Sequence, residues 1–168
     1  VSVIALAAFS VGYFVGTITA QTAETPILLE PASFTETASY TISGEDTDND
    51  GVFDIIYAKN GTTGEIEFSG TDASQVIQQA INALVNGGKI LIKKGTYSIT
   101  STITLKHGIF ISGEEVKSTI LKTAPDVDIF NMDESGVSPV PRGGGFEKMT
   151  LQGGGGNETL ITVNNVWK

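Results

Sequence analysis

The chain has 168 residues, of which 40% are hydrophobic and 17% charged, with a formal net charge of −9 and no cysteine. This length and apolar content support one domain with a core of its own. Lys and Arg number 10 against 19 acids and form no basic stripe, which argues against a nucleic-acid partner. The absence of cysteine excludes disulfides and thiolate metal sites, and the acidic surplus suits an extracellular protein, a cation binder or both.

Residues 1–20 carry no charge, and a helix of about 20 such residues matches the ~30 Å hydrocarbon core of a bilayer. They predict a membrane anchor or a cleaved signal peptide, although no positive charge precedes the apolar run. A buried helix of a globular core is the less favoured alternative. Residues 21–40 are typical of a linker, since they are rich in Thr, Ser, Glu and Pro. An anchor and a signal peptide both place the remaining chain outside the cytoplasm, so we expect a secreted or cell-surface protein that contacts the membrane through residues 1–20 if these are not cleaved.

Residues 41–71 predict a small β-hairpin unit, because the strand candidates "VFDIIYAKN" and "EIEFSG" flank an Asn-Gly pair at Asn60. Residues 72–86 predict an amphipathic helix that begins at the N-cap Asp72 and ends before Gly87. Its apolar residues recur at 3.6-residue spacing: Ala73, Val76, Ile77, Ala80, Ile81, Leu84 and Val85.

After Gly88 the apolar period changes to two, which indicates strands. The residues expected on one face are all odd-numbered: Tyr97, Ile99, Ile103, Leu105, Ile109 and Ile111. Short apolar segments follow, namely "STILKT", "DIFNM", "FEKMTLQ" and "LITVNNV", separated by glycines and polar residues. Such a series predicts a sandwich, a barrel or a β-solenoid.

The order of these motifs resembles the start of the pectate-lyase-like right-handed parallel β-helix proteins. "TDASQVIQQAINAL" is similar to the family's capping helix, "GGKILIKKGTYSI" to its first strands and "STITLKHGIFISGE" to the next coil. Lys93 is a departure, because the family usually has Pro before the Gly-Thr-Tyr turn. The resemblance covers roughly residues 70–168 and is specific for fold but weak for function.

The resemblance implies an all-β fold in which residues 72–168 form a capping helix and the first rungs of a β-helix. The apolar N-terminal helix, the linker and the hairpin unit at 41–71 would precede it. The family's enzymes act on acidic polysaccharides, usually on the middle rungs. We therefore expect an exported protein that acts on or binds polysaccharide, as a lyase or a glycoside hydrolase if it is an enzyme, with most of its active face beyond Lys168. The alternative is a non-catalytic adhesin or spike in which the β-helix is a structural and binding module.

The stretch "EDTDNDGVFD", residues 45–54, matches the first nine positions of the D-x-D-x-D-G calcium loop. Its predicted Ca²⁺ ligands are four carboxylates and one backbone carbonyl: Asp46, Asp48, Asp50, Asp54 and the carbonyl of Val52. Tyr57 stands at the twelfth position, where such loops have a bidentate Glu, so we expect weak affinity. The alternative is a solvated acidic turn of a hairpin.

Other candidate residues have simpler interpretations. Acids around "DIFNM" offer paired carboxylates for glycoside hydrolysis, but a solvated loop of an acidic protein is the preferred interpretation: Asp126, Asp128, Asp133 and Glu134. His107 and Arg142 are read as surface residues of a turn and a loop. The triplets "NGT" at Asn60 and "NET" at Asn157 fit surface loops of an exported protein, although such triplets are frequent by chance.

Overall fold

The computed structural model describes residues 37–133 and 143–164, and the predicted apolar helix and most of the linker lie outside them. As expected, this part of the chain is all-β apart from one helix, α1 (Ala73–Ala83). Three strands precede α1: β1 (Tyr40–Glu45), β2 (Ile55–Asn60) and β3 (Ile66–Gly70). The strands that follow it are β4 (Gly88–Ile92), β5 (Gly95–Ile99), β6 (Ile103–Leu105), β7 (Ile109–Gly113), β8 (Thr119–Thr123), β9 (Phe130–Asp133), β10 (Gly145–Glu147), β11 (Thr150–Gln152) and β12 (Ile161–Asn164).

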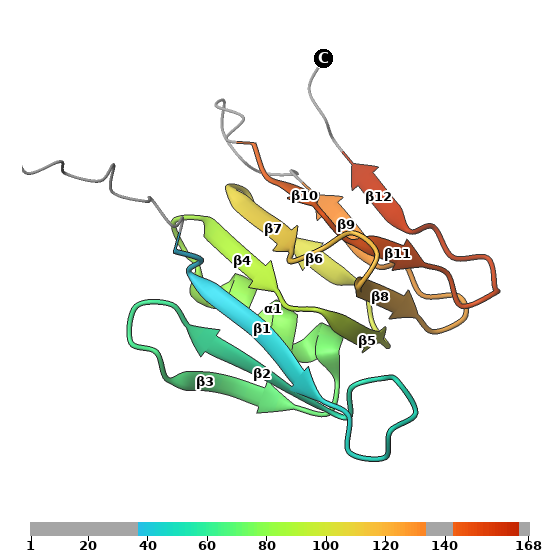
Figure 1. Ribbon diagram of the computed structural model, residues 1–168. Coiled ribbons are helices and arrows are strands. Elements are labelled where there is room, and N and C mark those ends of the chain that lie inside the picture. The colour runs from blue at the N-terminus through green and yellow to red at the C-terminus, as the bar shows by residue number, and fades with distance from the viewer. Residues whose placement is uncertain (1–36, 134–142, 165–168) are drawn as a thin grey trace, which may run out of the picture. The chain divides into compact units, whose positions relative to one another are not determined.

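The nine strands after α1 form three successive coils of the chain (Figure 1). Each strand pairs in parallel with the strand three elements later, so that β4–β7–β10, β5–β8–β11 and β6–β9–β12 make three sheets. The segment "FEKMTLQ", which reads as one strand in the sequence, is divided between β10 and β11 by a corner at Lys148, whose φ is +56°.

The core lies between these sheets. All six odd-numbered residues predicted to share a face are buried, each at most 4% exposed. The register places buried apolar residues of neighbouring coils next to one another, as in Tyr97 beside Leu121 and Ile90 beside Ile111. One coil alone cannot bury such a face, so stacking of coils is what makes the core continuous.

The predicted hairpin unit is confirmed and has a third strand. β2 pairs with β3 in antiparallel fashion through the turn that begins at Asn60, and β1 pairs with β2 across the acidic loop. The other side of β1 pairs in parallel with β4, from Tyr40 beside Ile90 to Ile42 beside Ile92. The hairpin unit and the first sheet of the coils therefore form one six-stranded sheet, in the order β10-β7-β4-β1-β2-β3.

Helix α1 lies behind β1 and β4 in Figure 1 and packs against β2, β3, β5 and β6. Asp72 is its N-cap and accepts a hydrogen bond from the Ser74 N–H at 2.9 Å. Five residues of the predicted apolar stripe are buried: Ala73, Val76, Ile77, Ala80 and Ile81. Leu84, the C-cap residue, is partly buried and packs against the core. The helix was predicted three residues too long, because it ends at Ala83, and Val85 is 82% exposed.

Three different groups cover the open strand edges of the first coil. On β4 the partner is β1, and on β5 the Phe53 N–H donates to the Thr96 carbonyl at 2.9 Å. On β6 the Gln78 side chain pairs with the backbone of Thr104, where Oε1 accepts from N–H at 2.8 Å and Nε2 donates to the carbonyl at 3.1 Å. One turn earlier on α1, Ser74 Oγ accepts N–H groups of the turn before β6. Backbone groups on the open edge of each of the three strands thus find partners.

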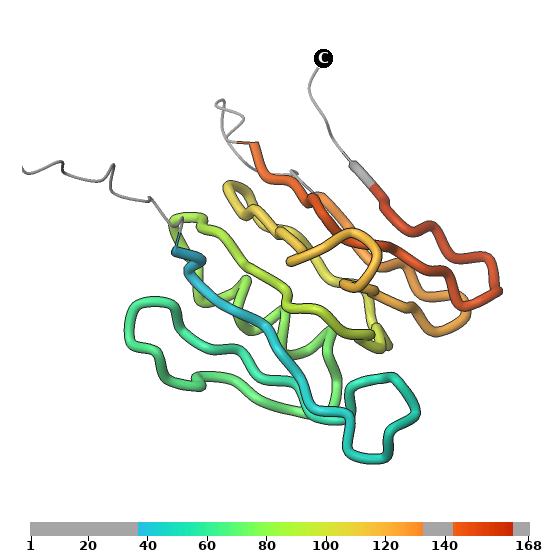
Figure 2. Tube along the Cα trace, in the orientation of Figure 1, coloured from blue at the N-terminus to red at the C-terminus, as the bar shows by residue number. Residues whose placement is uncertain are grey.

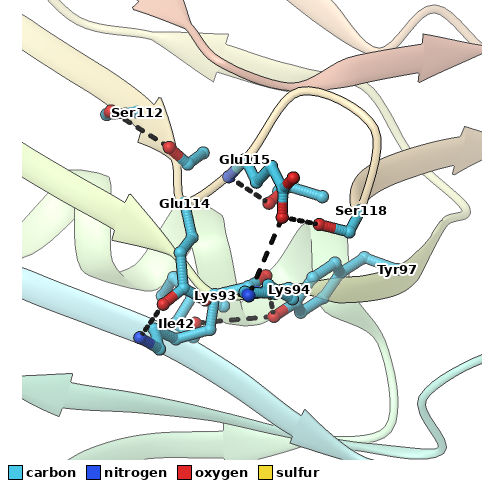
Figure 3. A network of polar contacts seen from close by, with 10 residues as sticks. Ile42, Lys93, Lys94, Tyr97, Ser112, Glu114, Glu115 and Ser118 are labelled. Carbon is cyan, nitrogen blue, oxygen red and sulfur yellow. Dashed lines mark hydrogen bonds and ion pairs between the residues drawn. The ribbon is translucent and has the colours of Figure 1, made fainter.

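The first two coils are joined by a polar network at the corner between β4 and β5 (Figure 3). Lys93 forms an ion pair with Glu114, whose second oxygen accepts the Lys94 N–H at 3.0 Å. The Tyr97 hydroxyl donates to the Lys93 carbonyl at 2.9 Å. These contacts give Lys93 a structural role at the position where the resembled family has Pro. They also hold the pKa of Glu114 below its ordinary value, first through the Lys93 hydrogen bond and then through the Lys94 N–H.

We predict that Ile81→Asp lowers the free energy of unfolding by at least ~3 kcal/mol, because it places an unpaired carboxylate in the core. Ile81 is fully buried beneath the helix. The matched control is Gln79→Asp, which changes an exposed residue of the same helix. Urea unfolding followed by circular dichroism measures both. Equal midpoints for wild type and Ile81→Asp would show that this face of α1 is not a core face.

A second prediction concerns how the Lys93–Glu114 ion pair contributes to stability as the pH falls. A carboxylate whose pKa is lowered by folding stabilises the protein above its unfolded-state pKa, and this contribution is lost as the pH falls through the folded-state pKa. The Lys93–Glu114 coupling, measured with Lys93→Met, Glu114→Gln and the double variant, should therefore be favourable at about pH 7 and decrease as the pH falls below the ordinary pKa of a glutamate. Lys117→Met, at an exposed lysine, serves as the control. A coupling independent of pH would show that the pair does not act through the ionised carboxylate.

Candidate metal centre

The acidic loop joins β1 to β2 and extends beyond the ends of both strands (Figure 2). Two residues in the left-handed region bend its backbone, Asn49 at φ +62° and Gly51 at φ +90°. Gly51 stands at the sixth loop position, where calcium loops need glycine for a sharp turn. The local sequence thus forms a compact curve, and side chains at alternate positions face its interior.

Three of the predicted ligands come together. One carboxylate oxygen each of Asp46, Asp48 and Asp50 lies within 4.8 Å of the others. Each of these side chains also accepts a backbone hydrogen bond within the loop. Asp46 Oδ2 accepts from Gly51 N–H at 2.9 Å, Asp48 Oδ1 from Asp50 N–H at 3.1 Å and Asp50 Oδ1 from Val52 N–H at 2.8 Å. The loop backbone therefore fixes the three carboxylates in place.

The Asp46 Oδ1 atom is enclosed and has no hydrogen-bond partner among the described residues. A buried carboxylate oxygen without a partner is costly, and three like charges at this spacing repel one another. A divalent cation bound to these oxygens would relieve both costs. The donor set, carboxylate oxygens without nitrogen or sulfur, is the one that hard cations such as Ca²⁺ prefer.

Asp54 lies outside this group of three. Its Oδ2 accepts hydrogen bonds from the Thr47 N–H at 2.7 Å and the Thr47 hydroxyl at 2.6 Å. The hydroxyl and then the N–H of Thr47 hold the pKa of Asp54 below its ordinary value. Asp54 therefore closes the neck of the loop as an ionised acceptor. It stands at the ninth loop position, where calcium loops often bind the ion through water.

Phe53 attaches the loop to the first coil. Its ring meets Tyr97 edge-on, with centroids 5.1 Å apart. The ring occupies the space above Gly44 and Gly95, where an added Cβ would approach it to 2.5 and 2.0 Å. Both glycines are therefore needed for the close approach of Phe53, and the loop that carries the carboxylates is held at one end by the core.

Two of the other candidate acids have structural roles. Asp126 Oδ1 accepts the Asn157 N–H at 2.8 Å, and Asp128 Oδ1 accepts the Thr159 N–H at 2.7 Å. Asp128 Oδ2 also accepts from the Thr162 hydroxyl at 2.9 Å. Both aspartates thus join the second coil to the third, which agrees with a structural interpretation rather than with a pair for glycoside hydrolysis.

The remaining candidates add no second site. His107 is half-buried in the turn before β7, Glu134 and Arg142 lie outside the described residues, and the side chain of Asp133 does as well. Within residues 37–133 and 143–164, the only group of three or more potential metal ligands is the one in the acidic loop. No helix in these ranges is long and apolar enough to cross a membrane.

Comparisons with known proteins give little further information. No protein-family model matches the chain, and no curated protein does. Among solved structures, the chain is similar to ORF18 of Geobacillus virus E2, with a TM-score of 0.48 and 18% sequence identity. The similarity covers 71% of this chain, which spans 31% of the length of the phage protein.

Proposed function

We propose that the chain is the N-terminal part of a right-handed parallel β-helix of the pectate-lyase-like class. The observation that carries this proposal is the threefold repetition of parallel pairing, in which β4–β7–β10 and the two other sheets each gain one strand per coil. Connections between parallel strands of one sheet are right-handed in about 98% of cases, which supports the hand. The helix over the first coil and the order of the sequence motifs agree with it.

On this basis the protein is exported and acts on or binds polysaccharide. A stack of coils offers outward rows of side chains that extend along its axis, and a long polymer can lie along such a surface. The net charge of −9 and the uncharged residues 1–20 support a position at the cell surface or in the medium. In this proposal the described coils are cap and scaffold.

One observation favours the alternative, a non-catalytic adhesin or spike. The outward rows of two sheets are polar without clustered acids: Thr104, Asn131 and Thr162 in one, and Ser98, Lys122 and Gln152 in the other. Rows of this kind can bind a surface but supply no general acid and base. The two functions share the scaffold and differ in whether a bound polymer is cleaved.

The test uses the complete product of the gene, purified from the medium or membranes of its host. We expect it to be retained on polygalacturonate and to release oligosaccharides with unsaturated or reducing ends. Retention without product, with an active pectate lyase as the positive control, would establish the non-catalytic alternative. Failure to bind acidic and neutral polysaccharides alike would contradict the proposed action on polysaccharide.

We also propose that the acidic loop binds Ca²⁺. The three converging carboxylates, the enclosed Asp46 Oδ1 and the turn at Gly51 support the site. Asp54 and the carbonyl of Val52 would complete it at the ninth and seventh positions. Tyr57 lies in β2 beside Ser43 and supplies no carboxylate at the twelfth, so the affinity belongs at the weak end, on the order of 10⁻⁴ to 10⁻³ M.

We predict that calcium binds the chain with one site in this range and that Asp48→Asn weakens the binding, because it removes one charged oxygen from the shell. Calcium at about 100 times its dissociation constant should stabilise the wild type by ~2.7 kcal/mol. Titration calorimetry and thermal unfolding measure the two effects. Glu65→Gln, at an exposed acid outside the loop, is the control and should bind as wild type does. Equal heats from wild type and Asp48→Asn would leave the loop as a solvated turn.

A further inference from the structure

The two Asn-x-Thr triplets of the chain, at Asn60 and Asn157, have different surroundings in the structure. Both lie in turns between strands, so the sequence does not distinguish them. An N-linked glycan replaces one hydrogen of the Asn Nδ2 atom, and its transfer requires that the Asn amide and the Thr hydroxyl both be reached from outside. The contacts of the two amides therefore decide which triplet can be modified in the folded protein.

The amide of Asn60 holds the β2–β3 turn together. Its Oδ1 accepts the N–H groups of Thr62 and Thr63 at 2.8 and 3.2 Å. Its Nδ2 donates to Glu67 Oε2 at 2.9 Å, and the same oxygen accepts the Tyr40 hydroxyl at 2.6 Å. Asn60 is half-buried, and its amide nitrogen is directed across the hairpin. Transfer of a glycan to this atom would require the turn to open.

Asn157 has the opposite arrangement, because its backbone is fixed while its side chain is exposed. Its N–H donates to Asp126, and the Thr159 N–H donates to Asp128, and both aspartates belong to the second coil. The side chain of Thr159 is also exposed. Glu158, between them, accepts the N–H groups of Gly155 and Gly156 at 2.9 and 2.7 Å, which turns its own carboxylate back into the loop. The triplet is thus presented on an ordered corner.

We propose that Asn157, and not Asn60, is an acceptor for N-linked oligosaccharide in the folded protein. In the transfer, Nδ2 of Asn157 forms a bond to the anomeric carbon of an oligosaccharide carried on a lipid phosphate, and the bond from that carbon to the phosphate oxygen breaks. The amide proton passes to a base of the transferase, and the phosphate leaves with the lipid. The proposal rests on the export proposed above, since this modification is a property of secreted proteins.

The experiment uses the purified full chain, shown to be folded by circular dichroism, with a lipid-linked oligosaccharide and a single-subunit oligosaccharyltransferase that accepts Asn-x-Thr. Peptide mass mapping locates the glycan. We expect transfer to Asn157 alone in the folded wild type and in Asn60→Gln, and none in Asn157→Gln. Thr159→Ala is the matched control, because it removes the hydroxyl of the triplet and leaves Asn157 and the backbone hydrogen bond to Asp128 in place.

The same reaction on the heat-unfolded chain shows what the fold contributes. Once the hydrogen bonds of Asn60 are lost, both triplets should be modified to a similar extent. Folded protein without glycan at Asn157, or with equal transfer to both sites, would overturn the assignment. Because the purified protein needs no export here, such a result would leave the proposed function untouched, whereas the polysaccharide experiment bears on that function and not on Asn157.

Discussion

Each of the three strands of the first coil has one edge that no other coil can cover. The N-terminal half of the described chain is organised so that other groups cover these edges. A strand edge left open exposes N–H and C=O groups that would pair with another chain. Here β1, the backbone of Phe53 and the side chain of Gln78 each cover one edge. The hairpin unit, the loop and the helix thus share one structural role, which is to cover the edges of the first coil. The Phe53 contact also positions the acidic loop.

Much of this arrangement could be predicted from sequence, because local periodicity encodes it. The helix, the β2–β3 hairpin and the inward face of the early strands all follow from apolar spacing and turn residues. The pairing of β1 with β4 could not be predicted, since it joins residues about 50 positions apart and no local pattern records a partner. The corner at Lys148 could not be predicted either, because its left-handed φ occurs at a lysine and no glycine marks the position.

The candidate site was predicted in the same uneven way. Spacing alone identified the three carboxylates that converge, whereas the role of Asp54 depends on Thr47, which no motif includes. The structural roles of the acidic residues could not be predicted from the sequence either. Carboxylates accept backbone N–H groups at several corners, and such residues explain part of the negative charge without any ligand: Asp72, Glu114, Asp126, Asp128 and Glu158. Composition counts these acids but does not show what they bind.

The covered edges all belong to the end of the stack that is synthesised first. β1, Phe53 and α1 are complete before β4, β5 and β6 emerge, so each new strand meets a partner that already exists. Later coils then add one by one to an edge that the previous coil provides. Pairing between distant segments slows folding, and each strand of the later coils pairs with a strand only one coil earlier in the chain. The direction of the stack, from the first coil to the third, is therefore also the order in which its strands are synthesised.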